Sequence, residues 1–221
     1  MKNVGIAKLL GAVVLCATMM WTACSAAWIS EAEQIVAALM PATANLVTLV
    51  ATLQGKTVAA SDLQTIQSAG TQVGADLQLM QSLITQYQKA DASAQPGLLN
   101  QIESATSAVQ STLNGLLPAL HITDVATQAK VTAVVGLLLS EVESMAAIVP
   151  LVNPSASPAM MNRAARQAKK RPPLTASEFV SSYNATMTAK TGNAELDHAT
   201  AGLHIHLHEK FARWASGGLL K

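Results

Sequence analysis

The segment 61–87, SDLQTIQSAGTQVGADLQLMQSLITQY, decides the fold of this chain. Its apolar positions recur at alternating spacings of three and four residues, the heptad pattern of a helix that packs against other helices. These positions are Leu63, Ile66, Gly70, Val73, Leu77, Met80, Ile84 and Tyr87. A capping box at Ser61 and Gln64 predicts the start of the helix. Because Gly70 is the small member of the series, we expect a neighbouring helix to approach closely there.

Three other segments have the same helical character. A capping box in Ser30-Glu31-Ala32-Glu33 predicts a helix from about residue 31 to residue 55. The next helix is expected over 98–117, and the last opens at Asp124 and closes at Pro150. The connections are short, as antiparallel neighbours require. The sequence therefore predicts an all-α protein with an antiparallel four-helix bundle.

The apolar segment 131–152 has a second interpretation as a membrane span. Glu141 and Glu143 lie near its middle, and carboxylates are costly at that depth in a bilayer. A buried bundle helix is therefore favoured, and insertion of this helix into membranes stays an alternative. Because Glu141 and Glu143 are two residues apart, they face different sides of the helix and do not form an acid/base pair.

The N-terminal residues 1–23 have the features of a signal peptide. Lys2 and Lys8 precede an uncharged apolar run over 9–21, which is shorter than the roughly 20 residues that span a bilayer. The motif Trp21-Thr22-Ala23-Cys24 then resembles the lipobox of bacterial lipoproteins. The resemblance implies that Cys24 becomes the lipidated first residue of the mature chain.

The residues after Cys24 bear on processing and location. Ser25 follows the cysteine directly, and in the lipoproteins that this segment resembles, a residue other than Asp there permits sorting to the outer membrane, facing the periplasm. A rival cleavage site at Ser25-Ala26-Ala27 would release a soluble secreted or periplasmic protein that begins at Trp28. The mature part, unlike the signal, resembles no family.

Charge divides the mature chain into two regions. Residues 24–153 carry three lysines against nine acidic residues, a net charge of −6. Residues 154–221 carry nine cations against four acids, a net charge of +5. The whole chain is half apolar and only 12% charged, which excludes a disordered protein, and its net charge of +1 argues against nucleic-acid binding. We expect an acidic aliphatic bundle and a basic tail.

The basic region begins with a proline-containing linker over 154–174. Residues 159–171 within it have the composition of a basic helix. Such a helix contacts anionic lipid headgroups in one interpretation and is a solvated linker in the other.

The tail over 175–221 is expected to form a helical hairpin. A capping box at Thr175 and Glu178 predicts its first helix, and its second helix is expected over 194–216. The tail is rich in aromatic residues, which are enriched at interface hot spots. They are Phe179, Tyr183, Phe211 and Trp214. The hairpin must dock on the bundle or on a protein partner to be stable.

Three histidines in the tail are the candidate metal ligands. On a strand, His204, His206 and His208 would share one face and could bind zinc or another divalent metal. On the helix that the pattern favours, His204 and His208 are neighbours, with Asp197 on the same side. Exposed histidines that bind nothing, or that respond to pH near neutrality, are the other interpretations.

The sequence carries no GxSxG, Walker A, GxGxxG or CxxC motif. We therefore expect a non-enzymatic, lipid-anchored scaffold of the bacterial cell envelope that requires no cofactor and contacts a protein partner through its tail. The alternatives are a metal-binding protein that uses the three histidines and a membrane-active helical protein.

Overall fold

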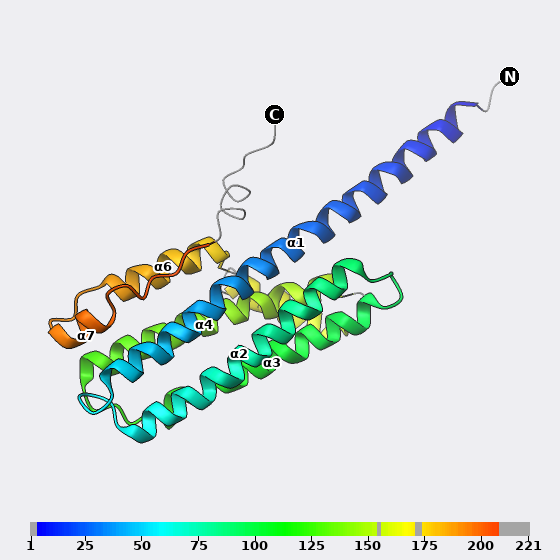
Figure 1. Cartoon of the computed structure of the whole chain (residues 1–221). Coiled ribbons are helices and arrows are strands. Elements are labelled where there is room, and N and C mark those ends of the chain that lie inside the picture. The colour runs from blue at the N-terminus through cyan, green and yellow to red at the C-terminus, as the bar shows by residue number, and fades with distance from the viewer. Residues whose placement is uncertain (1–3, 154–155, 171–173, 208–221) are drawn as a thin grey trace.

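The computed structural model describes residues 4–153, 156–170 and 174–207 and gives most side chains from Ala27 onward. Within these ranges it contains seven helices and no strand, so the all-α prediction is confirmed (Figure 1). The helices are α1 (Val4–Leu53), α2 (Ala60–Lys89), α3 (Gln95–Ala119), α4 (Val125–Val152), α5 (Pro158–Lys170), α6 (Ala176–Thr188) and α7 (Ala194–Ala199).

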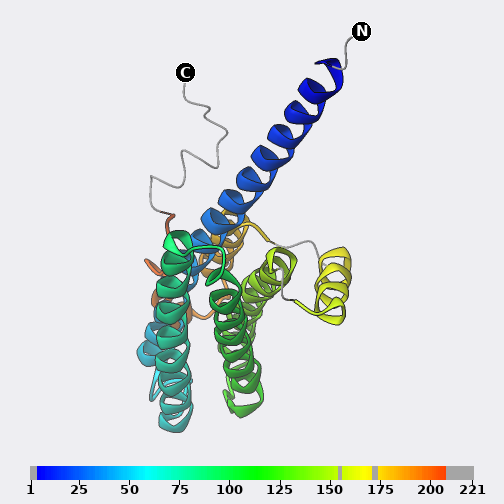
Figure 2. The ribbon, with the colours of Figure 1, turned by 90° about the vertical axis from the view of Figure 1, so that its right-hand side faces the viewer.

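The first four helices form the predicted four-helix bundle. Consecutive helices run antiparallel, and α1 packs against α4 to close the bundle. The helices α1 and α4 form a central pair, and a further layer covers its other side. In this layer α6 packs on α4 and α1, and α7 packs on α1. The first half of α1 projects beyond the bundle, and α5 lies beside the half of the bundle from which it projects (Figure 2).

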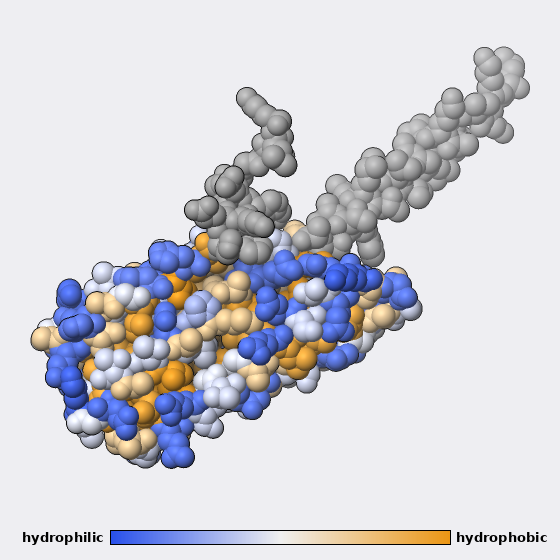
Figure 3. Space-filling view, in the orientation of Figure 1, coloured by the Kyte–Doolittle hydropathy of each residue, from blue (hydrophilic) through white to orange (hydrophobic). Residues whose placement is uncertain are grey.

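The two layers around α1 and α4 explain why these helices are so apolar. Buried residues occur around the whole circumference of α4, because α1, α3, α5 and α6 all contact it. Two segments, Ala27–Leu53 and Val125–Val152, are long and apolar enough to cross a membrane, yet half or more of an apolar 18-residue stretch within each is buried inside the protein. This burial is typical of core helices. On the described part of the face in Figure 3, apolar and polar side chains are interspersed.

One predicted helix start and one predicted capping box are wrong. No helix begins near residue 31, because α1 is continuous from Val4 and no helix-breaking residue separates the two parts. The Ser30 hydroxyl accepts a hydrogen bond from the Gln34 amide one turn later instead of capping a helix end. The start of α2 is Ala60, preceded by Ala59 without a side-chain cap, so the capping box at 61–64 does not form.

Two other helix starts are confirmed by their hydrogen bonds. Asp124 caps α4, where its carboxylate accepts from the backbone N–H of Thr127 at 2.8 Å. Thr175 and Glu178 form both bonds of the capping box that opens α6. At the other end of α4, Pro150 does not stop the helix but lies within its last turn.

The predicted helix over 194–216 is wrong for residues 200–207. α7 has only six residues and is followed by a turn, in which Gly202 has φ = 85°. That left-handed conformation favours glycine and cannot continue an α-helix. Residues 203–207 contain no helix: Figure 1 shows them as an extended segment beside α6, and exposed and more buried side chains alternate along it. Residues 208–216 lie outside the described part of the chain.

Gly70 brings α1 and α2 together, as the sequence predicts. A Cβ atom added at Gly70 would lie 2.5 Å from Cγ2 of Val47 on α1. Valine has little freedom at χ1, so its side chain cannot turn away easily. The absence of a side chain at Gly70 therefore sets the distance between the two helices.

Replacing Gly70 by alanine should lower the free energy of unfolding. We expect the overpacking against Val47 to cost about 1–3 kcal/mol, which exceeds the gain of about 1 kcal/mol in helix propensity. Gly74→Ala is the matched control on the same helix, because nothing lies within 4 Å of an added Cβ there. Urea unfolding should show that Gly74→Ala stabilises the protein. Equal stabilities of the two variants would contradict this account of the helix contact.

Candidate functional site

The region where α6 and the following chain cover α1 and α4 contains the charged and amide contacts between the tail and the bundle. At the C-terminus of α6, Lys130 of α4 donates from Nζ to the carbonyl oxygens of Thr186 and Ala189, both at 2.7 Å. These carbonyls lie at the negative end of the helix dipole, where a cation is favourable. Burial lowers the pKa of Lys130 below its ordinary value, and the nearby Asp197 carboxylate opposes this shift.

The N-terminus of α6 is held by acceptors from the two central helices. The backbone N–H of Leu174 donates to the Ser144 hydroxyl of α4 at 2.8 Å. The backbone N–H of Ala176 donates to Oε1 of Glu31 on α1 at 3.0 Å. A carboxylate is favourable at this positive end of the helix dipole. Both ends of α6 are therefore matched in charge by the bundle.

Glu141 of α4 is a buried carboxyl without a hydrogen-bond partner. Its side chain is 0% exposed, and neither carboxyl oxygen is hydrogen-bonded. Its pKa is raised to about 8, chiefly by burial and in smaller part by the nearby carboxylates of Glu31 and Glu178. Glu141 therefore holds a proton at neutral pH. Glu143 is exposed, so the prediction that these two residues face different sides is confirmed.

Two asparagines hold the extended segment 203–207 against α1 and α6. Asn45 of α1 donates from Nδ2 to the carbonyl oxygen of Leu203 at 3.0 Å. Asn184 of α6 donates to the carbonyl oxygen of Ile205 and accepts from its N–H, both at 2.9 Å. This paired bonding resembles that between neighbouring β-strands. The backbone of Ile205, whose side chain is 2% exposed, is therefore fully hydrogen-bonded.

The extended segment separates its histidines from its apolar residues. His204 and His206 are exposed, whereas Leu203, Ile205 and Leu207 are buried or half-buried. His208 lies outside the described residues. The helix that would have placed Asp197 and His204 on one side is interrupted, because α7 ends at Ala199, and the Asp197 carboxylate accepts from the N–H and the hydroxyl of Thr191 at 2.9 Å each. Among the described residues, no group of three or more His, Cys, Asp or Glu side chains is arranged to hold a metal ion.

The tail aromatics that the structure describes pack inside the protein. Phe179 and Tyr183 of α6 are both 0% exposed, so they attach α6 to the bundle and are not open to a partner. Phe211 and Trp214 lie outside the described residues.

Cys24, the predicted lipidation site, lies in the part of α1 whose side chains are not described. The first described core residue of α1 is Trp28, which is 6% exposed. Its ring makes an edge-on contact with Tyr87 of α2, with 5.1 Å between the ring centroids. Trp28, which packs in the bundle core, therefore lies only four positions after Cys24.

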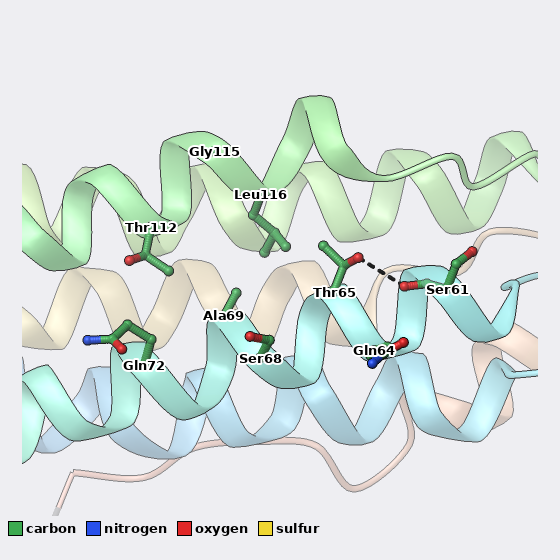
Figure 4. A pocket seen from close by; sticks show the side chains of 9 residues that line it. All are labelled: Ser61, Gln64, Thr65, Ser68, Ala69, Gln72, Thr112, Gly115 and Leu116. Carbon is green, nitrogen blue, oxygen red and sulfur yellow. Dashed lines mark hydrogen bonds between the residues drawn. The ribbon is translucent and has the colours of Figure 1, made fainter.

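A groove of about 700 Å³ lies between α2 and α3 (Figure 4). Its walls are formed by Ser61, Gln64, Thr65, Ser68, Ala69, Gln72, Thr112, Gly115 and Leu116. Gly115 leaves its α3 wall open, because no atom lies within 4 Å of a Cβ added there. Hydroxyl and amide groups dominate this lining, and none of the nine residues is ionisable. The groove can offer hydrogen bonds but not acid–base chemistry from its own walls.

Sequence reasoning missed the residues that attach the tail to the bundle. Lys130 could have been identified as a buried ionisable group, because it is a lone cation directly before the apolar segment 131–152 of a predicted core helix. Asn45 and Asn184 gave no such indication, since asparagine is common on protein surfaces.

Comparison with known proteins adds no assignment to this geometry: no family model, no curated protein and no solved structure matches the chain.

Glu141→Gln should change how stability depends on pH. The unfolded carboxyl loses its proton near pH 4.5, whereas the folded one keeps it up to about pH 8. Between these values the folded state binds more protons, so its stability falls by about 1.4 kcal/mol per pH unit. We expect Glu141→Gln to remove this contribution and to be more stable than the wild type at the alkaline end.

Urea unfolding at several pH values in this window measures the effect. Glu143→Gln is the control, because it removes an exposed carboxyl from the same helix and should keep the contribution of Glu141 to the slope. A Glu141→Gln variant with the full wild-type slope would show that Glu141 is not the buried acid responsible.

Proposed function

We propose that the chain is a lipid-anchored protein of the bacterial cell envelope that acts as a non-enzymatic helical scaffold. Its anchor is a lipid on Cys24, in an outer membrane and facing the periplasm. The observation that carries the proposal is the burial of Trp28, which is 6% exposed, packs on Tyr87 of α2 and lies four residues after Cys24. Cleavage before Cys24 would leave Trp28 inside the mature chain, preceded by four residues.

The same observation weighs against the rival cleavage site. Cleavage before Trp28 would create a charged α-amino group on a residue that is 6% exposed and packed on Tyr87. Placing a charge next to a buried side chain is costly. Processing at Cys24 instead leaves a short connection between the anchor and the first core residue.

The contact with a protein partner is proposed for the exposed parts of the tail. Phe179 and Tyr183 are buried and cannot contact a partner. The exposed side of the extended segment 203–207 and the residues after it would make this contact instead. His204 and His206 are the exposed side chains of that segment.

Mass spectrometry of the protein purified from bacterial membranes tests the anchor. We expect a mature chain that begins at Cys24 and carries the added mass of acyl groups, and we expect Cys24→Ala to accumulate as the unprocessed precursor. Cys16→Ala is the matched control, because this cysteine lies within the predicted signal peptide and should not affect processing. An unmodified chain that begins at Trp28 would overturn the proposal.

A second candidate function is binding of a divalent metal by the tail histidines. The observation in its favour is the extended backbone over 203–207, with His204 and His206 exposed on it. Residues two apart on an extended chain lie on the same side, so two imidazoles could approach one zinc ion. His208 continues the same spacing in the sequence.

Calorimetric titration of the purified protein with zinc tests this candidate. We expect saturable binding that is lost in the triple variant His204→Ala, His206→Ala and His208→Ala. His121→Ala is the control, because His121 is exposed in the loop between α3 and α4. No binding by the wild type, or the same binding by the triple variant, would remove this function.

A further inference from the structure

The helix α5 carries a concentrated positive charge on an otherwise acidic body. Its thirteen residues, PAMMNRAARQAKK, contain four cations and no acid. The preceding mature chain, residues 24–153, has a net charge of −6. An anionic surface would therefore attract α5 and repel much of the remaining bundle.

The described side chains of α5 divide between two sides of the helix. Ala164 is 2% exposed, whereas Arg166 and Lys169 are exposed. At 3.6 residues per turn, positions two and five residues after Ala164 lie on the opposite side of the helix. Arg166 and Lys169 are thus directed away from α4, against which α5 packs.

An exposed apolar side chain lies on the same helix as these cations. Met161 of α5 is 39% exposed, and Leu151, in the last turn of the preceding helix α4, is 55% exposed. They are two of the four large apolar side chains with high exposure in the described residues. A combination of cations with a few exposed apolar groups is typical of helices that lie at a membrane interface.

The position of α5 brings this surface near the proposed anchor. Figure 2 shows α5 beside the half of the bundle from which α1 projects toward its N-terminus. We propose that α5 is a docking surface for anionic phospholipid headgroups, which holds the anchored bundle against its own membrane. The proposal rests on the proposed function only for the choice of membrane, since the charge of α5 does not depend on the lipid at Cys24.

Vesicle sedimentation of the chain from residue 24 onward, with Cys24→Ser, tests the proposal without an anchor. This chain keeps the whole described core, which begins at Trp28, and circular dichroism checks its helix content. We expect binding to vesicles of phosphatidylcholine mixed with phosphatidylglycerol, little binding to phosphatidylcholine alone, and release by salt. The double variant Arg166→Gln and Lys169→Gln should bind about 30-fold more weakly, from about 1 kcal/mol for each lost cation.

The matched control is Lys56→Gln with Lys190→Gln, which removes two exposed lysines at the opposite end of the bundle. It should bind as the parent does. Equal binding to both kinds of vesicle, or equal weakening by the two double variants, would overturn the proposal that α5 binds anionic headgroups. Absence of lipid on Cys24 would instead overturn the anchor and leave the vesicle result intact.

Discussion

The structure depends on burying α1 and α4 from two sides. In an ordinary four-helix bundle each helix keeps one face in water, but here α6 and α7 cover the faces of the central pair that α2 and α3 leave open. Both central helices must therefore be apolar around most of their circumference. This requirement accounts for a chain that is half apolar, and aliphatic side chains fill most of the described core.

Burial of α1 and α4 under α6 and α7 is unfavourable wherever a polar side chain loses its contact with water. Lys130 is accommodated, because its ammonium bonds the C-terminal carbonyls of the helix that buries it. Glu141 has no such partner and remains in the core only by keeping its proton. The same layer is thus stabilised at one end by a buried cation and weakened by a buried acid as the pH rises.

The parts of the fold that sequence predicted are those with a repeated local pattern. The heptad seam of 61–87 and the caps at Asp124 and Thr175 depend on neighbours within a few residues. The extended segment 203–207 depends on Asn45 and Asn184, which are distant in sequence, and its apolar residues fit a helix pattern almost as well as an extended one. The helix over 194–216 was predicted from local pattern alone. In the structure the positive φ of Gly202 ends the helical turn, and the two asparagine amides bind the chain that follows.

An anchor at Cys24 and a basic surface on α5 would reinforce each other. A tether of a few residues keeps the bundle next to the membrane, so binding of α5 to lipid becomes an intramolecular step at high effective concentration. A contact too weak to recruit a soluble protein could then still fix the orientation of an anchored one. The acidic charge of the bundle would favour the same orientation, because an anionic membrane would repel the bundle's other faces. The opposite charges of the bundle and α5 would then together orient an anchored protein.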